Sequence, residues 1–231
     1  MSIASALDDV RGRIHAAATG SGRDPSAVRL IAVSKTQPAE AVREAYGAGQ
    51  RDFGENYVQE LVEKAEALRD LTQLRWHMIG HLQRNKAKQV APLVCLVHTV
   101  DGVDLARELA KRIAATGTDR RLQVLVEVSI AGEAQKHGAA PGDLAELCQS
   151  IEAMPALSLR GLMCVPPFTD DASGARPFFE QLSALREQHG GAARLPELSM
   201  GMTHDLEQAV AAGATLVRVG TAIFGARAAK V

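Results

Sequence analysis

A lysine directly follows one of the apolar runs of this sequence. The run Leu30–Ser34 leads into Lys35, and a lysine at the end of a buried strand is partly withdrawn from water. A partly desolvated amine loses its proton readily and can form a Schiff base with a carbonyl compound. Position alone leaves the alternative of a solvated lysine that merely ends a strand. Lys35 is therefore a candidate for covalent chemistry with an aldehyde or ketone.

A second group of polar residues, near the C-terminus, is suited to holding an anion. Arg218 stands inside the apolar run Leu216–Val219, where a charged guanidinium needs either a buried carboxylate or a ligand. Gly220 and Thr221 then open a short final helix, whose first N–H groups and hydroxyl suit a phosphate. Ser199, at the end of an earlier apolar run, offers a further hydroxyl. Turn geometry alone also accounts for the glycine, so the anion site is a hypothesis.

A lysine and an anion site together suit a phosphorylated aldehyde. Pyridoxal 5′-phosphate (PLP) fits, because its aldehyde reacts with lysine, its phosphate binds at a helix N-terminus and its ring nitrogen takes an Asp or Arg partner. Arg218 would be that partner, and because arginine does not give up its proton, the ring nitrogen would stay unprotonated. Such a ring is a weak electron sink, which disfavours carbanion chemistry. A sugar-phosphate enzyme with Lys35 as an aldolase-type Schiff base is a weaker alternative.

The elements that must position these residues follow a repeating pattern. Eight short β-rich runs occur, several of them continuously apolar as in strands buried on both faces, at Leu30–Ser34, Arg51–Phe53, Arg75–Ile79, Cys95–Val100, Leu122–Ser129, Leu159–Val165, Glu197–Met200 and Leu216–Val219. Helical stretches lie between them, at Ala39–Tyr46, Val58–Leu68, Val103–Ala115, Leu144–Met154, Pro177–Gln188 and Leu206–Ala212.

This alternation predicts one α/β domain over residues 1–231, a (β/α)8 (TIM) barrel preceded by an additional helix around Ala4–Ala18. An open doubly wound sheet is the alternative, but neither a G-x-G-x-x-G fingerprint nor a P-loop occurs. The active site of such a barrel lies at the carboxyl ends of the strands, where Lys35 and Gly220 are expected.

Composition excludes several other classes of protein. Among 231 residues, 26 basic and 27 acidic side chains give a formal net charge of -1, and 3% are aromatic, which disfavours nucleic-acid binding. We also expect no membrane association, because the longest apolar stretch is far shorter than the roughly 18 to 20 residues of a spanning helix. Three widely spaced cysteines and an N-terminus without a basic, apolar leader favour the cytoplasm.

Five ordered motifs span nearly the whole chain: Ala32-Val33-Ser34-Lys35-Thr36, Phe53-Gly54-Glu55-Asn56-Tyr57, Trp76 to Lys86 (WHMIGHLQRNK), Leu198-Ser199-Met200-Gly201-Met202 and Val217 to Gly225 (VRVGTAIFG). On these motifs the sequence resembles the pyridoxal phosphate homeostasis proteins, single-domain relatives of the alanine racemase barrel. The resemblance implies a fold-type-III PLP protein.

The resemblance also implies roles for single residues. Lys35 would carry the cofactor, Arg218 would face its ring nitrogen, and its phosphate would be held by Ser199, Gly220 and Thr221. Further pocket residues would be Asn56, His77 and Met200. Many relatives have a second lysine two positions after the first, where this chain has Gln37, and Lys136 matches a lysine common in the family's fifth βα loop, where a solvated lysine is the alternative.

Two functions from different classes remain. One is a carrier that holds PLP reversibly as a lysine aldimine, contributes to PLP homeostasis and supplies cofactor to apoenzymes. The other is an amino-acid racemase, which needs an acid/base on each face of its substrate. In the resembling racemases one base is a tyrosine of a second domain, whereas this chain is expected to end after its eighth strand, with tyrosines only at Tyr46 and Tyr57. We therefore predict a carrier, not an enzyme, and a monomer.

One spacing suggests a metal site. His77 and His81 are four residues apart, as metal ligands on one helix face are, but this stretch is predicted to be a strand and lacks the glutamate of a metalloprotease motif. We therefore predict no metal site.

Overall fold

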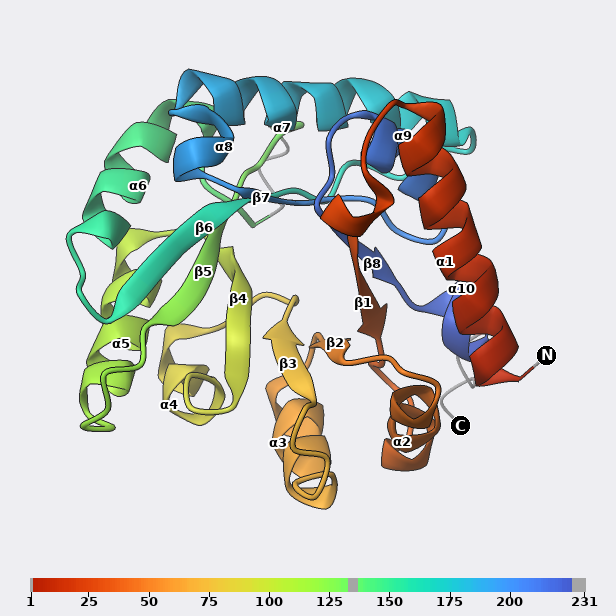
Figure 1. Cartoon of the computed structure of the whole chain (residues 1–231). Helices are drawn as coiled ribbons and strands as arrows, with labels where there is room; N and C mark the ends of the chain where they lie inside the picture. The colour runs from red at the N-terminus through yellow and green to blue at the C-terminus, as the bar shows by residue number, and fades with distance from the viewer. Residues whose placement is uncertain (1, 133–136, 226–231) are drawn as a thin grey trace.

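A closed barrel of eight parallel strands forms the centre of the molecule (Figure 1). The computed structural model describes residues 2–132 and 137–225. Each strand pairs with the next along the chain, and β8 closes the ring against β1. The strands are β1 (Arg29–Val33), β2 (Asp52–Glu55), β3 (Arg75–Met78), β4 (Val94–Val100), β5 (Leu122–Glu127), β6 (Leu157–Met163), β7 (Glu197–Ser199) and β8 (Leu216–Val219).

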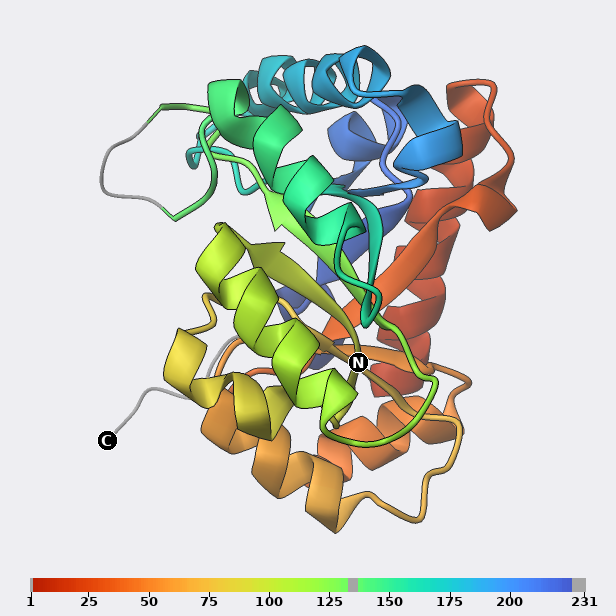
Figure 2. The same ribbon diagram turned by 90° about the vertical axis from the view of Figure 1, so that its left-hand side faces the viewer.

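Helices follow the strands and cover the outside of the barrel. They are α1 (Ile3–Gly20), α2 (Ala39–Gly47), α3 (Val58–Ala67), α4 (Ala87–Val90), α5 (Val103–Ala114), α6 (Leu144–Glu152), α7 (Arg176–Gln188), α8 (Gly191–Arg194), α9 (Leu206–Ala211) and α10 (Thr221–Phe224). The additional helix α1 packs along α9 and α10, next to the seam where β8 meets β1 (Figure 1). Neighbouring helices α5 and α6 lie side by side on the outside (Figure 2).

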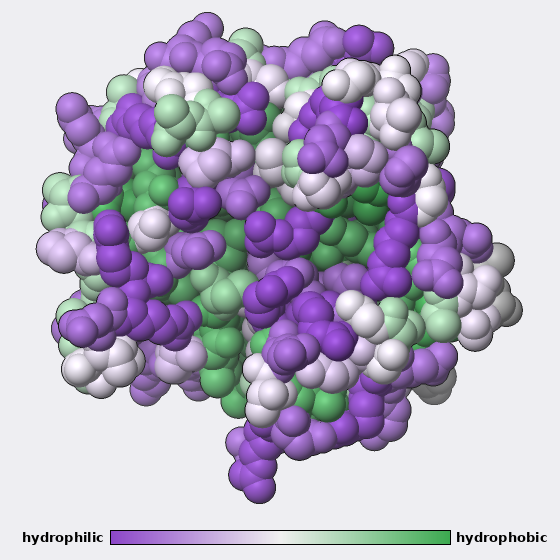
Figure 3. All heavy atoms as spheres, in the orientation of Figure 1, coloured by the Kyte–Doolittle hydropathy of each residue, from purple (hydrophilic) through white to green (hydrophobic). Residues whose placement is uncertain are grey.

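Apolar side chains are buried in two places, which explains the continuously apolar strands. The larger cluster fills the space between the barrel and its helices, as where Leu105, Leu109 and Ile113 of α5 are buried. A smaller cluster inside the barrel consists of Ile31, Leu96, Leu125, Met163 and Leu216. Hydrophilic side chains cover most of the face shown in Figure 3, with hydrophobic ones showing between them.

The predicted architecture is confirmed: an α/β barrel of eight strands with an N-terminal helix. The predicted strand ends differ by a few residues, since β6 begins at Leu157 and β5 ends at Glu127. The short helices α4 and α8 were not predicted, because four-residue helices leave no periodicity to detect. No helix in the part of the chain that the structure describes has the length and apolar character to cross a lipid bilayer.

The contact between β6 and β7 depends on a glycine. Gly161 has φ of 153°, and a Cβ atom there would lie 1.8 Å from the carbonyl oxygen of Glu197. We expect Gly161→Ala to lower the free energy of unfolding by about 3 kcal/mol, because the two strands must move apart. Urea denaturation measures this.

The control is Gly12→Ala in α1, where the new methyl group would meet no atom within 4 Å. Because alanine has the higher helix propensity, this variant should be more stable by about 1 kcal/mol. Equal stability of Gly161→Ala and the unsubstituted protein would contradict the close approach of β6 and β7.

Candidate functional site

Several residues suited to chemistry meet at the carboxyl ends of neighbouring strands. Lys35 follows β1, Asn56 follows β2, and Gly220 and Thr221 follow β8, and these three strands are adjacent in the barrel. Gly220 lies directly against β1, since a Cβ atom added to it would lie 3.1 Å from the carbonyl oxygen of Val33. The structure thus brings the predicted lysine and the predicted anion-binding turn to one side of the barrel mouth.

The backbone around Lys35 is held in an unusual conformation. Lys35 is half-buried, and the next residue, Thr36, is the one non-glycine residue with positive φ (64°) among those the structure describes. A β-branched residue in the left-handed region is strained and persists only where its surroundings enforce it. The Thr36 N–H donates to Glu60 Oε2 at 2.7 Å, and the Ser34 N–H donates to the Gly54 carbonyl at 3.0 Å. Both neighbours of Lys35 are therefore fixed.

A buried ion pair supports the same turn from below. The Lys64 ammonium donates to the Ser34 carbonyl at 2.6 Å and to Glu55 Oε1 at 2.7 Å, and the Ser34 hydroxyl donates to the same carboxylate oxygen at 2.7 Å. Burial raises the pKa of Glu55, and the nearby Lys64 opposes that shift. Lys64 is thus the cation that opposes the rise in the pKa of Glu55, and it also holds the end of β1 through the Ser34 carbonyl.

Removing this cation should be costly. We expect Lys64→Met to lower the free energy of unfolding by about 3 kcal/mol, because it leaves the fully buried Glu55 without its counter-charge. The double variant Lys64→Met/Glu55→Gln should recover part of that loss. Urea denaturation of both variants measures the coupling.

An exposed ion pair serves as the comparison. Arg69 and Glu66 form such a pair on the protein surface, and Arg69→Ala should cost less than about 1 kcal/mol. If Lys64→Met were as mild as Arg69→Ala, the buried pair would not be holding the turn.

A cavity of about 290 Å³ opens at the barrel mouth, among the segments that follow β2 to β6. Its lining includes Asn56 and Glu127, the last residue of β5. Asn56 Oδ1 and Glu127 Oε2 are buried and have no hydrogen-bond partner among the described residues. Burial and the nearby Asp101 carboxylate raise the pKa of Glu127 to about 7. Buried polar atoms without partners are uncommon in native proteins, so this cavity has the character of a ligand site.

Arg218 lies inside the barrel, on β8, below this mouth. Its Nη1 donates to Ser199 Oγ at 2.6 Å, and its Nη2 donates to the carbonyl oxygen of Cys164 at 2.9 Å. The guanidinium is buried, and burial lowers its pKa. Asp205 and Glu127 favour the charge from a distance. The sequence predicted a buried carboxylate or a ligand as the partner of Arg218; the structure instead gives it a hydroxyl and a backbone carbonyl.

A chain of buried hydrogen bonds continues from Ser199 across the barrel interior. Ser199 Oγ lies 2.8 Å from His98 Nδ1, His98 Nε2 lies 3.0 Å from His77 Nδ1, and His77 Nε2 lies 2.9 Å from Asp52 Oδ1. One set of tautomers satisfies every atom: the hydroxyl donates to His98, His98 to His77, and His77 to the carboxylate. We name Arg218, Ser199, His98, His77 and Asp52 the interior relay.

The pKa values of the two histidines of the relay shift in opposite directions. Burial disfavours a charge on both rings, but the hydrogen bond to Asp52 raises the pKa of His77. Burial, together with the charges of His77 and Arg218, keeps the pKa of His98 well below its ordinary value. His98 is therefore the neutral link of the relay.

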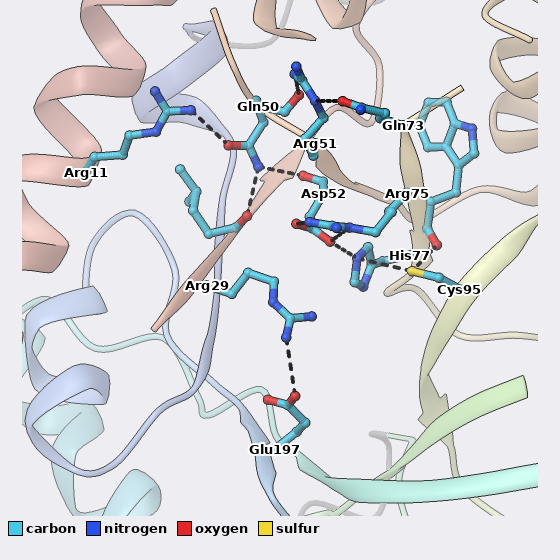
Figure 4. A network of polar contacts seen from close by, with 12 residues as sticks. Arg11, Arg29, Gln50, Arg51, Asp52, Gln73, Arg75, His77, Cys95 and Glu197 are labelled. Atoms are coloured by element: carbon cyan, nitrogen blue, oxygen red, sulfur yellow. Dashed lines mark hydrogen bonds and ion pairs between the residues drawn. The ribbon is translucent and has the colours of Figure 1, made fainter. Parts of the chain in front are cut away.

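Asp52 ends the relay at the amino end of β2. Arg75 Nε and Nη2 both donate to its carboxylate, and His77 approaches the oxygen from inside the barrel (Figure 4). Burial works against ionisation, but His77 and Arg75 together hold the pKa of Asp52 at about 2, below its ordinary value of 3.8.

Asp52 should make the protein sensitive to acid. A carboxyl group whose pKa is lower in the folded state stabilises the fold above about pH 4, and that contribution, about 2 kcal/mol, is lost as the pH falls toward 2. Asp52→Asn should therefore flatten the decline of the unfolding free energy between pH 4 and pH 2. Denaturant unfolding at a series of pH values measures it, with the exposed Asp8→Asn as control. An unchanged slope in Asp52→Asn would contradict this assignment.

Comparison with known proteins decides the family. Residues 7–228 match the family model of the alanine racemase N-terminal domain. A pyridoxal phosphate homeostasis protein of Pseudomonas aeruginosa is 46% identical over 226 residues, which cover 97% of this chain and 96% of the relative. The chain belongs to the pyridoxal phosphate homeostasis protein family.

Solved structures of this family's fold superpose closely. PipY of Synechococcus elongatus, determined with PLP bound, is 38% identical with a TM-score of 0.82, and the alignment covers 97% of this chain and 100% of PipY. An unknown protein from Bifidobacterium adolescentis is 38% identical with a TM-score of 0.88, and covers 96% and 94% of the two chains.

Three residues that the resemblance to homeostasis proteins placed in the pocket lie deeper than expected. His77, Ser199 and Met200 have no exposed surface. Ser199 was expected to offer its hydroxyl to a phosphate, but that hydroxyl is engaged by His98 and Arg218. His77 precedes the last residue of β3 and points into the barrel toward Asp52, and Met200 packs in the core between barrel and helices. Their contacts are with the barrel interior and the core, and their pocket roles stay predictions.

Other residues of the site were missed. Glu127, His98 and the pair Glu55–Lys64 were not singled out, although Glu127 ends an apolar run just as Lys35 follows one. For Glu55, His98 and Glu127 the available signal was a charged or imidazole side chain within or at the end of a strand; Lys64 lies in α3 and gave no such signal. Lys136 lies outside the described residues.

The two histidines of the metal-type spacing do not share a site. His77 is inside the barrel, whereas the ring of His81 stacks on His137 at 3.5 Å and its Nδ1 lies 3.5 Å from Asp101 Oδ2. One ligand atom each of His81, Asp101 and His137 lie within 4.8 Å of one another, and His77 is not part of this group.

Proposed function

We propose that this protein binds PLP reversibly at the barrel mouth, with Lys35 as its covalent anchor, and so buffers the free cofactor and supplies it to apoenzymes. The observation that carries the proposal is the cavity at the barrel mouth, where two buried polar atoms, Asn56 Oδ1 and Glu127 Oε2, have no hydrogen-bond partner among the described residues. Such atoms need a polar ligand. The names of the relatives and the PLP-bound state of PipY support the choice of ligand.

The residues around the mouth suit the parts of PLP. When bound, PLP supplies a reactive aldehyde conjugated to a pyridine ring. Lys35 would hold the aldehyde carbon, and the first N–H groups of α10 with the Thr221 hydroxyl would hold the phosphate, since a helix leaves those N–H groups without intrahelical acceptors. Gly220 keeps this turn close to β1.

Arg218 would face the ring nitrogen, with Ser199 and His98 holding its guanidinium in position. A guanidinium only donates hydrogen bonds, so it leaves the ring nitrogen as an acceptor and keeps electron withdrawal by the ring weak. At neutral pH Glu127, with a pKa of about 7, both donates and accepts hydrogen bonds. Met200 would support the pocket from the core. These features suit storage of the cofactor better than turnover of amino acids.

The proposed recipients are apoenzymes that depend on PLP, met transiently in the cytoplasm, and the proposed state is a monomer. Transfer is tested by mixing the PLP-loaded protein with such an apoenzyme while a phosphatase destroys free PLP. We expect the apoenzyme to gain activity in the presence of this protein and not with Lys35→Ala.

Two results would overturn this function. Failure of the protein to retain PLP through gel filtration would remove the carrier, and steady racemisation of an amino acid at about 1 per second or faster would replace it with an enzyme. Sedimentation of the loaded protein tests the monomer separately.

A further inference from the structure

A second cavity, of about 460 Å³, opens at the opposite end of the barrel. It is formed where strands begin, since Arg29 is the first residue of β1, Asp52 of β2 and Arg75 of β3. Arg11 of α1 and Arg51, just before β2, complete the wall. Four arginines thus line one hollow, and Figure 4 shows them around Gln50 and Asp52. We name this hollow the arginine pocket.

Contacts with the protein fix most of these guanidinium groups. Arg51 Nη1 donates to the Tyr46 carbonyl at 2.8 Å, and its guanidinium lies 4.0 Å from the centre of the Tyr46 ring. Arg11 donates to the Ala48 carbonyl at 3.3 Å and to Gln50 Oε1 at 3.4 Å. Because these side chains are already ordered, a ligand would not have to immobilise them.

Positive charge exceeds negative charge in the pocket. Asp52 is the one carboxylate in its lining, and it is engaged by Arg75 Nε and Nη2 and by His77. Arg29 approaches Glu197 at 3.6 Å, beyond the range of a good hydrogen bond. A guanidinium carries five N–H groups, so Arg29 and Arg75 retain donors for a further acceptor. His15, also in the lining, adds a titratable nitrogen.

We propose that the arginine pocket binds a phosphorylated small molecule, separately from the cofactor at the barrel mouth. The planar fork of a guanidinium matches two oxygens of one phosphate, and several arginines around one hollow suit a di- or polyanion. The volume lies in the range of small-molecule sites, about 300 to 1,000 Å³, and admits a molecule of the size of a sugar phosphate or a nucleotide. The proposal does not depend on PLP binding, because the two sites lie at opposite ends of the strands.

The test is calorimetric titration with inorganic pyrophosphate. Pyrophosphate could also enter the barrel mouth, so the protein is first loaded with PLP, treated with borohydride and dialysed, and Lys35→Ala is titrated in parallel. We expect one site with a Kd of about 1 mM or tighter in the reduced, PLP-filled protein, and the same site in Lys35→Ala. The chain's one tryptophan, Trp76, adjoins Arg75, so its fluorescence offers a second reading of the same binding.

Variants assign the binding to the pocket. Arg29→Gln and Arg11→Gln should each weaken pyrophosphate binding about tenfold, as expected for one charge-assisted contact. Arg69→Gln is the matched control. Arg69 is exposed, lies just after α3 and does not line the pocket, so its replacement should leave the Kd of pyrophosphate unchanged. Thermal unfolding of each variant checks that it is folded.

Several results would overturn the proposal. One is the absence of pyrophosphate binding at about 10 mM. Another is that Arg69→Gln weakens binding as much as Arg29→Gln does. The third is that binding disappears when PLP fills the mouth and does not change in Arg29→Gln or Arg11→Gln. Failure to retain PLP, with pyrophosphate binding intact, would refute the proposed function and leave the arginine pocket standing.

Discussion

Replacing Lys35 with alanine is expected to abolish the near-ultraviolet and visible absorbance of lysine-bound PLP, while the unfolding free energy of the cofactor-free protein changes by less than about 1 kcal/mol. The anchor is lost because no other amine stands on the fixed turn between Ser34 and Thr36, within the part of the chain that the structure describes. The fold is kept because Lys35 is only half-buried, and the turn is held by the backbone and by Lys64. Absorbance spectroscopy after gel filtration, with urea denaturation, measures both effects.

The exposed lysine of α4 provides the control. Lys88→Ala removes an exposed amine and should keep the full absorbance. If Lys35→Ala retained the band and Lys88→Ala lost it, the anchor would lie elsewhere.

Replacing Arg218 with methionine should separate binding from stability. We expect PLP affinity to fall about tenfold or more, because a charged donor facing the ring nitrogen is lost. The free energy of unfolding of the cofactor-free protein should fall by no more than about 1 kcal/mol. Methionine loses the two hydrogen bonds to Ser199 and the Cys164 carbonyl, but it also removes the cost of burying a charge, and the two effects offset each other. Titration with PLP and urea denaturation give the two quantities.

Arg121→Met is the matched control for Arg218→Met. Like Arg218, Arg121 donates to a backbone carbonyl, that of Leu157. Arg121 directly precedes β5, at the end of the barrel away from the mouth. Its replacement should leave PLP affinity unchanged. Unchanged affinity in Arg218→Met would mean that this arginine serves the fold alone.

The barrel and the position of its mouth could be predicted because they depend on local pattern. Continuously apolar runs alternate with amphipathic stretches, and parallel strands bring their carboxyl ends to one rim. Lys35, Asn56, Gly220 and Thr221 all follow strands, so their convergence required only the correct order of elements. The five motifs identified the same family that the sequence comparison establishes.

The interior relay could not be predicted, because it depends on which side chains of different strands meet at one level inside the barrel. His77 and His98 are 21 residues apart, and Ser199 is 101 residues beyond His98. Their contact follows from the stagger of β3, β4 and β7, including the irregular pairing after Trp76, and no sequence period encodes that stagger. This is why the contacts of Ser199 with Arg218 and His98 were not predicted.

The most direct test of the central claim is peptide mass mapping after the protein has been incubated with PLP and reduced with borohydride, which converts a lysine-bound cofactor into a stable secondary amine. We predict one pyridoxyl-phosphate adduct, on the peptide containing Lys35, and its absence from Lys35→Ala. A reduced adduct spread over exposed lysines such as Lys88, with Lys35 unmodified, would contradict the assignment of the barrel mouth as the PLP site.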